Sequence, residues 1–208
     1  MSIIVPTVLA RNRESYDQGM DSIKGFTSRV HIDLMEEDFA GVSSIAPDQV
    51  WWPEGLEADI HAMYGNPAEY LDSLIALRPN TIVLHAEAQG NIRAMLSAIG
   101  AAGIRPGIAL LPDTQVPDVE YLLDKALHVL VFGGHLGHDG GVADLTQLAK
   151  ANQLRQQHPN VEIGWDGGAN ADNVSQLAEA GIDVIFAGSA IRGADDPQKA
   201  YEYLSSLL

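Results

Sequence analysis

The sequence predicts an α/β protein folded as a closed (β/α)8 barrel, the TIM-barrel architecture. Runs of apolar and β-branched residues recur about every 20 to 30 residues, and amphipathic stretches separate them, as in repeated βα units. An open doubly wound sheet would need a glycine-rich fingerprint after its first strand, and P-T-V-L-A-R-N-R contains no glycine. We therefore expect one barrel domain over residues 1–208.

The expected strands are short apolar runs that end at polar or turn-forming residues. Eight such runs are present, and eight βα units in about 200 residues close most economically into a barrel. Active sites of this fold form at the C-terminal ends of the strands. The expected strands are residues 2–9, 29–35, 57–63, 80–85, 105–110, 127–132, 161–166 and 183–187.

Capping residues predict a helix after the third strand. Asn66, Pro67 and Glu69 supply a cap, a first-turn proline and an acidic third position. The apolar run Y-L-D-S-L-I-A-L follows them directly. Together these residues predict a helix from about 67 to 77.

Other helix ends are marked by glycine and by a cap with proline. Gly103 and Gly181 are expected to end two helices, and Asp196-Pro197 to begin the last one. The stretch 36–56 is the least regular part of the chain. We expect it to be a long loop with about one turn of helix.

Composition excludes several classes of function. The 28 acidic and 12 basic residues give a formal net charge of −16, which repels nucleic acid and anionic membranes. No apolar run approaches the roughly 18 residues of a membrane span, and the N-terminus lacks the basic leader of a signal peptide. The absence of cysteine excludes disulfide and thiolate chemistry and fits a cytoplasmic protein. A small phosphorylated ligand is still allowed, because backbone amides can hold phosphate without lysine or arginine.

Three of the expected strands end on side chains that bind metals or protons. His31 and Asp33 lie at the end of the second strand, His61 at the end of the third and Asp166 at the end of the seventh. His31 and Asp33 are two residues apart, so both side chains leave one face of the strand. Two imidazoles and two carboxylates suit zinc, iron(II), manganese or cobalt. One such strand end alone is usually a satisfied polar residue, but three in one chain favour a metal site.

Motifs along the whole chain resemble the ribulose-phosphate 3-epimerase family, and in combination they are specific. The likeness runs from near residue 4 to the C-terminus, and it implies a barrel of the ribulose-phosphate-binding type. The matching segments are Pro6-Thr7-Val8-Leu9, the His-x-Asp-x-Met of His31 to Met35, the Asp-x-His-x-Met of Asp59 to Met63 with Asn66-Pro67, the H-A-E-A from His85, and the later runs G-I-A-L-L-P-D-T, W-D-G-G-A-N and A-G-S-A-I.

The resemblance implies one divalent metal ion bound by His31, Asp33, His61 and Asp166. It also makes Asp33 and Asp166 the acid/base pair, on opposite faces of a bound ketose phosphate. Inverting a carbon by proton exchange needs one carboxylate to remove the proton and another to deliver one from the other side, while a Lewis acid stabilises the enediolate. The implied reaction interconverts D-ribulose 5-phosphate and D-xylulose 5-phosphate at C3, as in the pentose phosphate pathway.

Substrate and phosphate contacts are implied at ten positions. Glycine amides near a helix N-terminus would bind the phosphate, with a serine hydroxyl beside them. His85, one of the ten, is expected to contact substrate or to orient Glu87 rather than to bind the metal. The partners expected are a phosphorylated ketose and further copies of the chain in a homo-oligomer. The ten residues are Thr7, Met35, Met63, His85, Gly140, Gly141, Gly167, Gly168, Gly188 and Ser189.

Two loops depart from the family pattern. Residues 36–41 read E-E-D-F-A-G, where the family has an aspartate and a stretch ending in Val-Pro-Asn. After the sixth strand, F-G-G-H-L-G-H-D-G-G replaces a methionine and a mobile Asn-Pro-Gly-Phe-Gly-Gly-Gln loop, so Phe132 stands where the methionine would be. The glycines that allow such a loop to move are kept.

The remaining histidines are interpreted as lying outside the metal site. His135, His138 and Asp139 could form a second metal site, but a glycine-rich loop seldom holds ligands rigidly, so this interpretation is disfavoured. His128 and His158 are expected at the surface or at helix ends.

The loop changes leave alternatives open for the function. One is an epimerase of a related six-carbon ketose phosphate such as allulose 6-phosphate. The other, from a different class, is a non-catalytic barrel that binds phosphate or metal. Two proton-transfer aspartates argue against the latter, because a binding site has no need of carboxylates on opposite faces. The identity of the metal and the size of the oligomer stay open.

Overall fold

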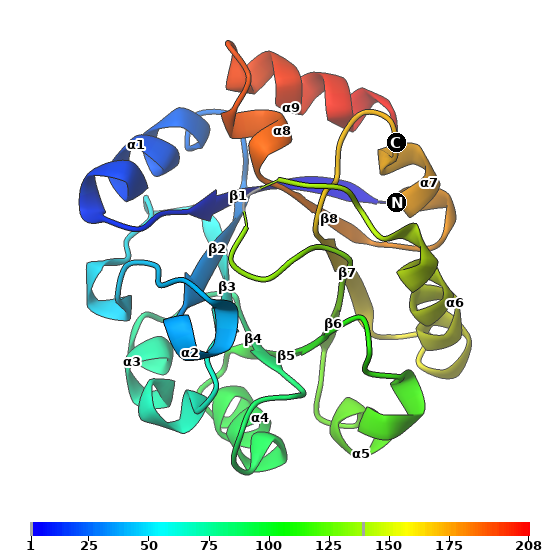
Figure 1. Ribbon diagram of the computed structural model, residues 1–208. Coiled ribbons are helices and arrows are strands. Elements are labelled where there is room, and N and C mark those ends of the chain that lie inside the picture. The colour runs from blue at the N-terminus through cyan, green and yellow to red at the C-terminus, as the bar shows by residue number, and fades with distance from the viewer. Residues whose placement is uncertain (1, 139) are drawn as a thin grey trace.

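The computed structural model describes residues 2–138 and 140–208 and forms a closed barrel of eight parallel strands (Figure 1). Each strand pairs with the next one in the chain, and β8 closes the ring on β1. All eight strands end where the sequence predicts, and their starts differ by at most one residue. The strands are β1 (Ile3–Leu9), β2 (Arg29–Met35), β3 (Glu57–Met63), β4 (Thr81–His85), β5 (Arg105–Leu110), β6 (His128–Phe132), β7 (Glu162–Asp166) and β8 (Val184–Ala187).

Helices surround the ring of strands, and the chain after β6 crosses the mouth of the barrel (Figure 1). The α-helices are α1 (Arg13–Ile23), α2 (Glu37–Ala40), α3 (Leu71–Ala76), α4 (Ile92–Ala101), α5 (Glu120–Leu123), α6 (Leu148–Gln157), α7 (Val174–Glu179), α8 (Ser189–Arg192) and α9 (Pro197–Ser206). The 3-10 turns are η1 (Pro47–Gln49), η2 (Pro67–Glu69), η3 (Val116–Val119) and η4 (Leu145–Gln147). Within the described residues, no helix has the length and apolar character needed to cross a membrane.

Most of the predicted helix ends are confirmed. Gly103 and Gly181 follow α4 and α7 with φ values of +79° and +88°, where glycine has no steric penalty. The Asp196 carboxylate accepts a hydrogen bond from the backbone N–H of Lys199 (3.1 Å) and so caps α9. The irregular stretch 36–56 contains the single turn α2, as expected, and also the 3-10 turn η1.

The predicted helix over 67–77 is divided into η2 and α3, so that prediction is wrong in its continuity. Tyr70 lies at the break with a φ of −109°. Its ring stacks on Tyr64 at 4.0 Å between centroids, and its hydroxyl donates a hydrogen bond to Glu36 (3.1 Å). These contacts with other segments outweigh the local capping signals.

The inside of the ring is layered, because alternate residues of each strand point inward. An apolar cluster fills the middle, and Phe186 belongs to it. The Phe186 ring stacks on His31 (3.8 Å between centroids) and lies 5.9 Å from His128. Phe186 therefore separates polar groups at the two ends of the barrel. The cluster consists of Val5, Val83, Ala109, Leu130, Val184 and Phe186.

The expectation that His128 lies at the surface or at a helix end is wrong. His128 begins β6 and is 1% exposed, and its Nδ1 lies 2.7 Å from the Glu162 carboxylate. The register of β6 and β7 places the two residues side by side. His158, as expected, lies at the end of helix α6, 3.2 Å from Glu120.

Candidate metal and substrate site

Four side chains that could bind a metal converge at the C-terminal mouth of the barrel. His31 Nε2 lies 3.3 Å from Asp33 Oδ1 and 4.0 Å from Asp166 Oδ2. His61 Nδ1 lies 3.1 Å from the same Asp33 oxygen and 3.4 Å from the same Asp166 oxygen. The register of β2 and β3 explains part of this convergence, because it pairs Asp33 directly with His61. One ligand atom from each residue lies within 4.8 Å of all the others.

The geometry of these four residues fits a divalent cation. Donor atoms that share one ion at about 2.0–2.2 Å lie about 3–4 Å apart. The four histidine–aspartate contacts, of 3.1 to 4.0 Å, are within this range. Both ring nitrogens of His31 are buried without a hydrogen-bond partner among the described residues, since the 3.3 Å contact with Asp33 is misaligned. Buried polar atoms are normally satisfied, so this imidazole is arranged for a partner that the described residues do not supply.

Residues 2–138 and 140–208 contain one group of three or more acidic or histidine side chains that could hold a metal, and it is this one. His135 and His138 do not join such a group. Asp139, the third residue of the disfavoured second site, lies outside the described residues.

Electrostatics at the four residues favours positive charge between the two carboxylates. Burial opposes protonation of His61, but its hydrogen bonds with Asp166 and Asp33 prevail and raise its pKa to about 9. Burial would raise the pKa of Asp33, but the imidazoles of His31 and His61 hold it well below its usual range. A cation bound here would take over this role of the protonated imidazole.

A second pair of residues lies behind His61, away from the aspartates. His61 Nε2 is 2.8 Å from His85 Nε2, and His85 Nδ1 is 3.3 Å from Glu87 Oε2. Burial lowers the pKa of His85 to about 4, so this imidazole is neutral at neutral pH. His85 therefore lies behind the four candidate ligands and is not a fifth member of that group.

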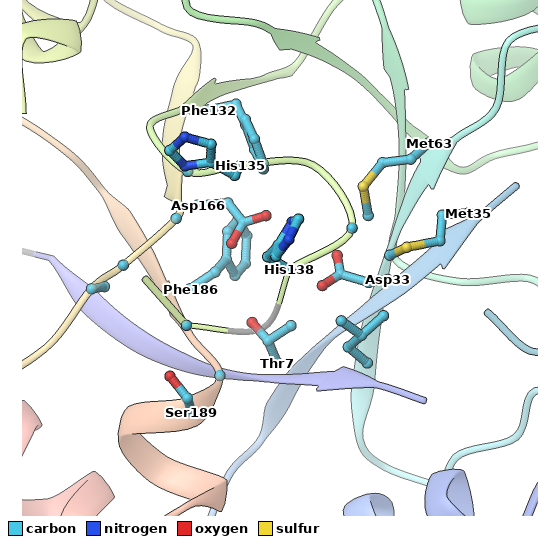
Figure 2. A pocket seen from close by; sticks show the side chains of 18 residues that line it. Thr7, Asp33, Met35, Met63, Phe132, His135, His138, Asp166, Phe186 and Ser189 are labelled. Carbon is cyan, nitrogen blue, oxygen red and sulfur yellow. The ribbon is translucent and has the colours of Figure 1, made fainter. Parts of the chain in front are cut away.

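A cavity of about 540 Å³, including the part open to solvent, lies above the four residues. Figure 2 shows the carboxylates of Asp33 and Asp166 approaching the cavity from opposite sides. Ten of the residues predicted from the sequence line it, namely Thr7, Asp33, Met35, Met63, Gly140, Asp166, Gly167, Gly168, Gly188 and Ser189.

Some predicted residues lie outside the described lining, and some lining residues were not predicted. His31 and His61 are completely buried, His85 lies behind His61, and Gly141 is not among the lining residues. The hydroxyl of Thr7 has no hydrogen-bond partner within the described residues and so is free to meet a ligand. The unpredicted lining residues are Leu9, Phe132, Gly134, His135, Gly137, His138, Ala169 and Phe186.

The β6 loop comprises residues 133–138 and 140–141 among the described residues. It closes over the mouth and therefore contributes five of the lining residues. Leu136 packs against the Met35 and Met63 cluster. Gly137 has a φ of +73°, and a Cβ there would collide with the carbonyl oxygen of Ala40. Glycine is thus required where the loop meets the segment after β2. The high glycine content is the signal in the sequence that could have indicated this close approach.

Comparison with known proteins shows the family of this chain. The model of the ribulose-phosphate 3 epimerase family matches residues 3–192. The chain belongs to this family. As a family member it is an isomerase, an epimerase that acts on carbohydrates.

Individual relatives and solved structures resemble this family member over most of their length. Ribulose-phosphate 3-epimerase of Helicobacter pylori (strain J99) is 27% identical over 211 residues, covering 98% of this chain and 97% of the relative. The cytoplasmic isoform of Oryza sativa subsp. japonica is 32% identical over 175 residues, covering 81% and 77%. The crystal structure of 3-hexulose-6-phosphate synthase from Salmonella typhimurium has a TM-score of 0.73 at 16% identity, covers 100% and 98%, and supports the fold alone.

Proposed function

We propose that this epimerase inverts C3 of a ketose phosphate, interconverting D-ribulose 5-phosphate and D-xylulose 5-phosphate. One observation carries the proposal: Asp33 and Asp166 face each other across a cavity, directly above two buried imidazoles. Inversion by proton exchange requires two acid/base groups on opposite faces of the reacting carbon, and carboxylates serve as such groups. The names of the relatives support the choice of substrate.

The two aspartates divide the proton transfer between them. One carboxylate removes the C3 proton from one face of the sugar, and the other, protonated, delivers a proton to the opposite face. In the reverse direction they exchange roles. His31, Asp33, His61 and Asp166 would hold a divalent ion such as zinc, iron(II), manganese or cobalt, which would supply a Lewis acid to stabilise the enediolate.

We assign the phosphate to the loops after β7 and β8. Gly167, Gly168, Gly188 and Ser189 line that side of the cavity. No lysine or arginine is among the described lining residues, so backbone amides and hydroxyl groups must do most of the binding. Met35, Met63 and Thr7 would contact the sugar from the other side.

A second candidate is an epimerase of a six-carbon ketose phosphate such as allulose 6-phosphate. The β6 loop supports keeping this candidate, because it places Leu136, His135 and His138 over the mouth in a sequence that departs from the family pattern. A change in the loop that covers the substrate changes which sugar the closed cavity can hold.

Proton exchange with solvent tests both candidates and the binding-only alternative. The purified protein, supplied with zinc, iron(II), manganese or cobalt in turn, is incubated in D2O with a panel of pentulose and hexulose phosphates. We expect deuterium at C3 together with formation of the C3 epimer, and about one bound ion per chain. Exchange with a hexulose phosphate alone would favour the second candidate. A protein that binds metal but exchanges no proton with any sugar would contradict both.

Domain organisation, oligomeric state and cellular location are proposed as well. We infer that residues 1–208 form a single domain, which one cooperative unfolding transition would support. We also propose a homo-oligomer, to be tested by sedimentation velocity, and a cytoplasmic location, which the lack of cysteine supports.

A further inference from the structure

Two sequence motifs, H-A-E-A from His85 and G-I-A-L-L-P-D-T, meet at one half-buried carboxylate, that of Glu87. Glu87 Oε2 lies 3.3 Å from His85 Nδ1. Its other oxygen, Oε1, accepts hydrogen bonds from the backbone N–H of Leu111 (2.9 Å) and from the hydroxyl of Thr114. Neither motif touches the proton-transfer pair directly, yet Glu87 connects both to the metal-binding residue His61 through His85.

The protons along this path follow from the distances. His61 Nδ1 faces Asp33 and Asp166, so an ion bound between them needs that nitrogen unprotonated, and the proton of the neutral ring then lies on Nε2. His85 Nε2, 2.8 Å away, must accept the hydrogen bond that the Nε2–H of His61 donates. The His85 proton then lies on Nδ1 and is donated to Glu87, since a carboxylate can only accept.

We propose that Glu87 is a positioning residue of the metal site. Through His85 it holds His61 in the Nε2-protonated tautomer, which leaves Nδ1 free to bind a divalent ion. This inference rests on the proposed metal site. Metal-binding histidines usually donate their second N–H to an outer group that fixes ring orientation and tautomer, and here the outer group is a second histidine anchored by a carboxylate.

The surroundings of Glu87 keep the carboxylate in place. Leu111 and Thr114 hold one oxygen, and the loop that carries them is held in turn by Lys150 of α6. The Lys150 ammonium donates to the carbonyl oxygens of Leu111 (2.6 Å) and Pro112 (2.9 Å), and this residue is 5% exposed. The path from α6 to His61 is thus made of direct contacts.

Glutamine at position 87 has nearly the same shape as glutamate, but it reverses the direction of the hydrogen bonds that lead through His85 to His61. Its carbonyl oxygen would accept from Leu111 and Thr114, which leaves the amide NH2 to donate to His85 Nδ1. His85 would then carry its proton on Nε2 and donate to His61, whose own proton would move to Nδ1, the atom needed by the metal. The opposite amide orientation would set the NH2 group against the N–H of Leu111.

Zinc affinity and histidine tautomers test the proposal without using activity. Glu87→Gln is compared with Glu69→Gln, a matched change in a second glutamate that lines a shallow cavity together with Glu87. Within the described residues, the Glu69 carboxylate accepts a hydrogen bond from the Asn66 side chain alone. Zinc dissociation constants are measured by competition with a chelator, and ring 15N shifts of the zinc-loaded and metal-free proteins report the tautomers. We expect Glu87→Gln to weaken zinc binding about 10–100-fold and to shift His85 to the Nε2-protonated form. Glu69→Gln should change neither, and Glu87→Asp should restore part of the affinity.

The outcomes separate this inference from the proposed function. If the wild-type protein binds zinc and Glu87→Gln binds it equally well with unchanged tautomers, Glu87 has no positioning role. If the wild-type protein binds none of zinc, iron(II), manganese and cobalt, the metal site itself fails. Should Glu87→Gln not fold, Thr114→Val removes one anchor of the carboxylate and is expected to weaken zinc binding in the same direction, by less; unchanged affinity there would overturn the inference.

Discussion

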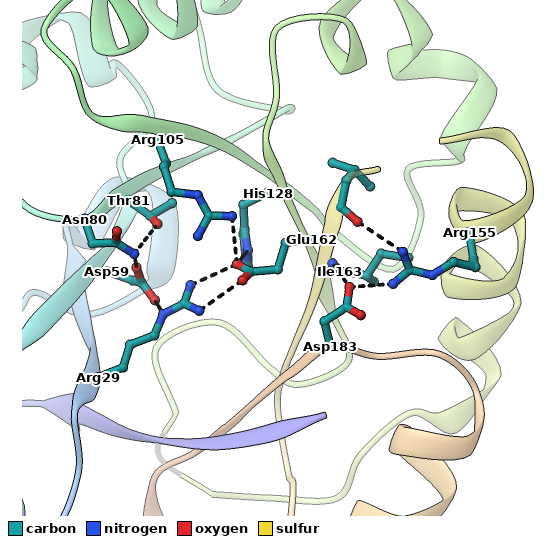
Figure 3. A network of polar contacts seen from close by, with 11 residues as sticks. Arg29, Asp59, Asn80, Thr81, Arg105, His128, Arg155, Glu162, Ile163 and Asp183 are labelled. Carbon is teal, nitrogen blue, oxygen red and sulfur yellow. Dashed lines mark hydrogen bonds and ion pairs between the residues drawn. The ribbon is translucent and has the colours of Figure 1, made fainter. Parts of the chain in front are cut away.

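The two ends of the barrel carry similar charged groups but differ in how those groups are satisfied. At the N-terminal end, Glu162 accepts two hydrogen bonds from Arg29 (3.1 and 2.9 Å) and lies 2.7 Å from His128 Nδ1 (Figure 3). Arg29 also donates to Asp59 (2.6 Å), which accepts a further hydrogen bond from Asn80 (3.0 Å). Each carboxylate there has a cationic partner within the protein.

At the C-terminal mouth, several buried polar atoms have no partner among residues 2–138 and 140–208. Both nitrogens of His31 and the hydroxyl of Thr7 are buried without a hydrogen bond within the described residues. At the other end His128 Nε2 is the corresponding exception, and it lies against Phe186. Networks that are complete within the protein stabilise the fold, whereas incomplete ones are ready for a ligand. The comparison therefore assigns stability to one end and chemistry to the other.

The largest effect is expected at the mouth. Asp33→Asn and Asp166→Asn should each lower the rate of epimerisation by about 10²–10⁴-fold, because inversion needs both acid/base groups. Metal content is measured beside the rate, since both residues are also proposed ligands. A variant with one base left and metal bound should still exchange the C3 proton while returning the starting epimer. Near-normal epimerisation with full metal occupancy would remove that aspartate from the mechanism.

A change at the opposite end should affect stability and leave chemistry alone. Glu162→Gln removes the charge that pairs with Arg29 and His128, and we expect the free energy of unfolding to fall by about 2–3 kcal/mol. Urea denaturation measures this loss, and kcat per folded molecule should be unchanged. A large drop in kcat with unaltered stability would show that the two ends are not separate in function.

The pH dependence of that loss sharpens the comparison. Burial opposes ionisation of Glu162, but His128 and Arg29 prevail and hold its pKa well below the usual range in the folded state. A carboxyl whose pKa is lower when folded adds stability above its unfolded pKa of about 4.3, and this stability is lost as the pH falls toward the folded value. The difference in unfolding free energy between wild type and Glu162→Gln should thus shrink from pH 6 to pH 3. Parallel curves would mean that the ion pairs contribute little.

The smallest effect is expected at the rim of the mouth. Ser189→Ala removes one hydroxyl beside the proposed phosphate position, and a hydrogen bond of about 1 kcal/mol corresponds to roughly a fivefold rise in KM. The rise should appear for the phosphorylated ketose only, and the free ketose should be a poor substrate of both proteins. Ser97→Ala on α4 is the control, because the Ser97 hydroxyl donates to the Arg93 carbonyl oxygen and has no other hydrogen bond in the described part of the chain. Equal turnover of free and phosphorylated sugar would count against the phosphate assignment.

Local sequence was sufficient for the barrel and for the group of candidate ligands. The strands are β-branched runs that end at polar residues, so their C-terminal ends could be placed without knowing their neighbours. Once these ends share one face of a closed ring, His31, Asp33, His61 and Asp166 must approach one another. Pattern and fold geometry were enough here, because each inference depends on one strand at a time.

Only the tertiary structure decided which partner each of several other polar side chains meets. His85 lies against His61 rather than in the cavity wall, and His128 is buried because strand register sets it beside Glu162. Tyr70 breaks a well-capped helix through its contacts with Tyr64 and Glu36. These contacts join residues 6 to 34 positions apart, so no local pattern encodes them. The strand ends come from propensity within each segment, whereas the partners of these side chains come from packing between segments.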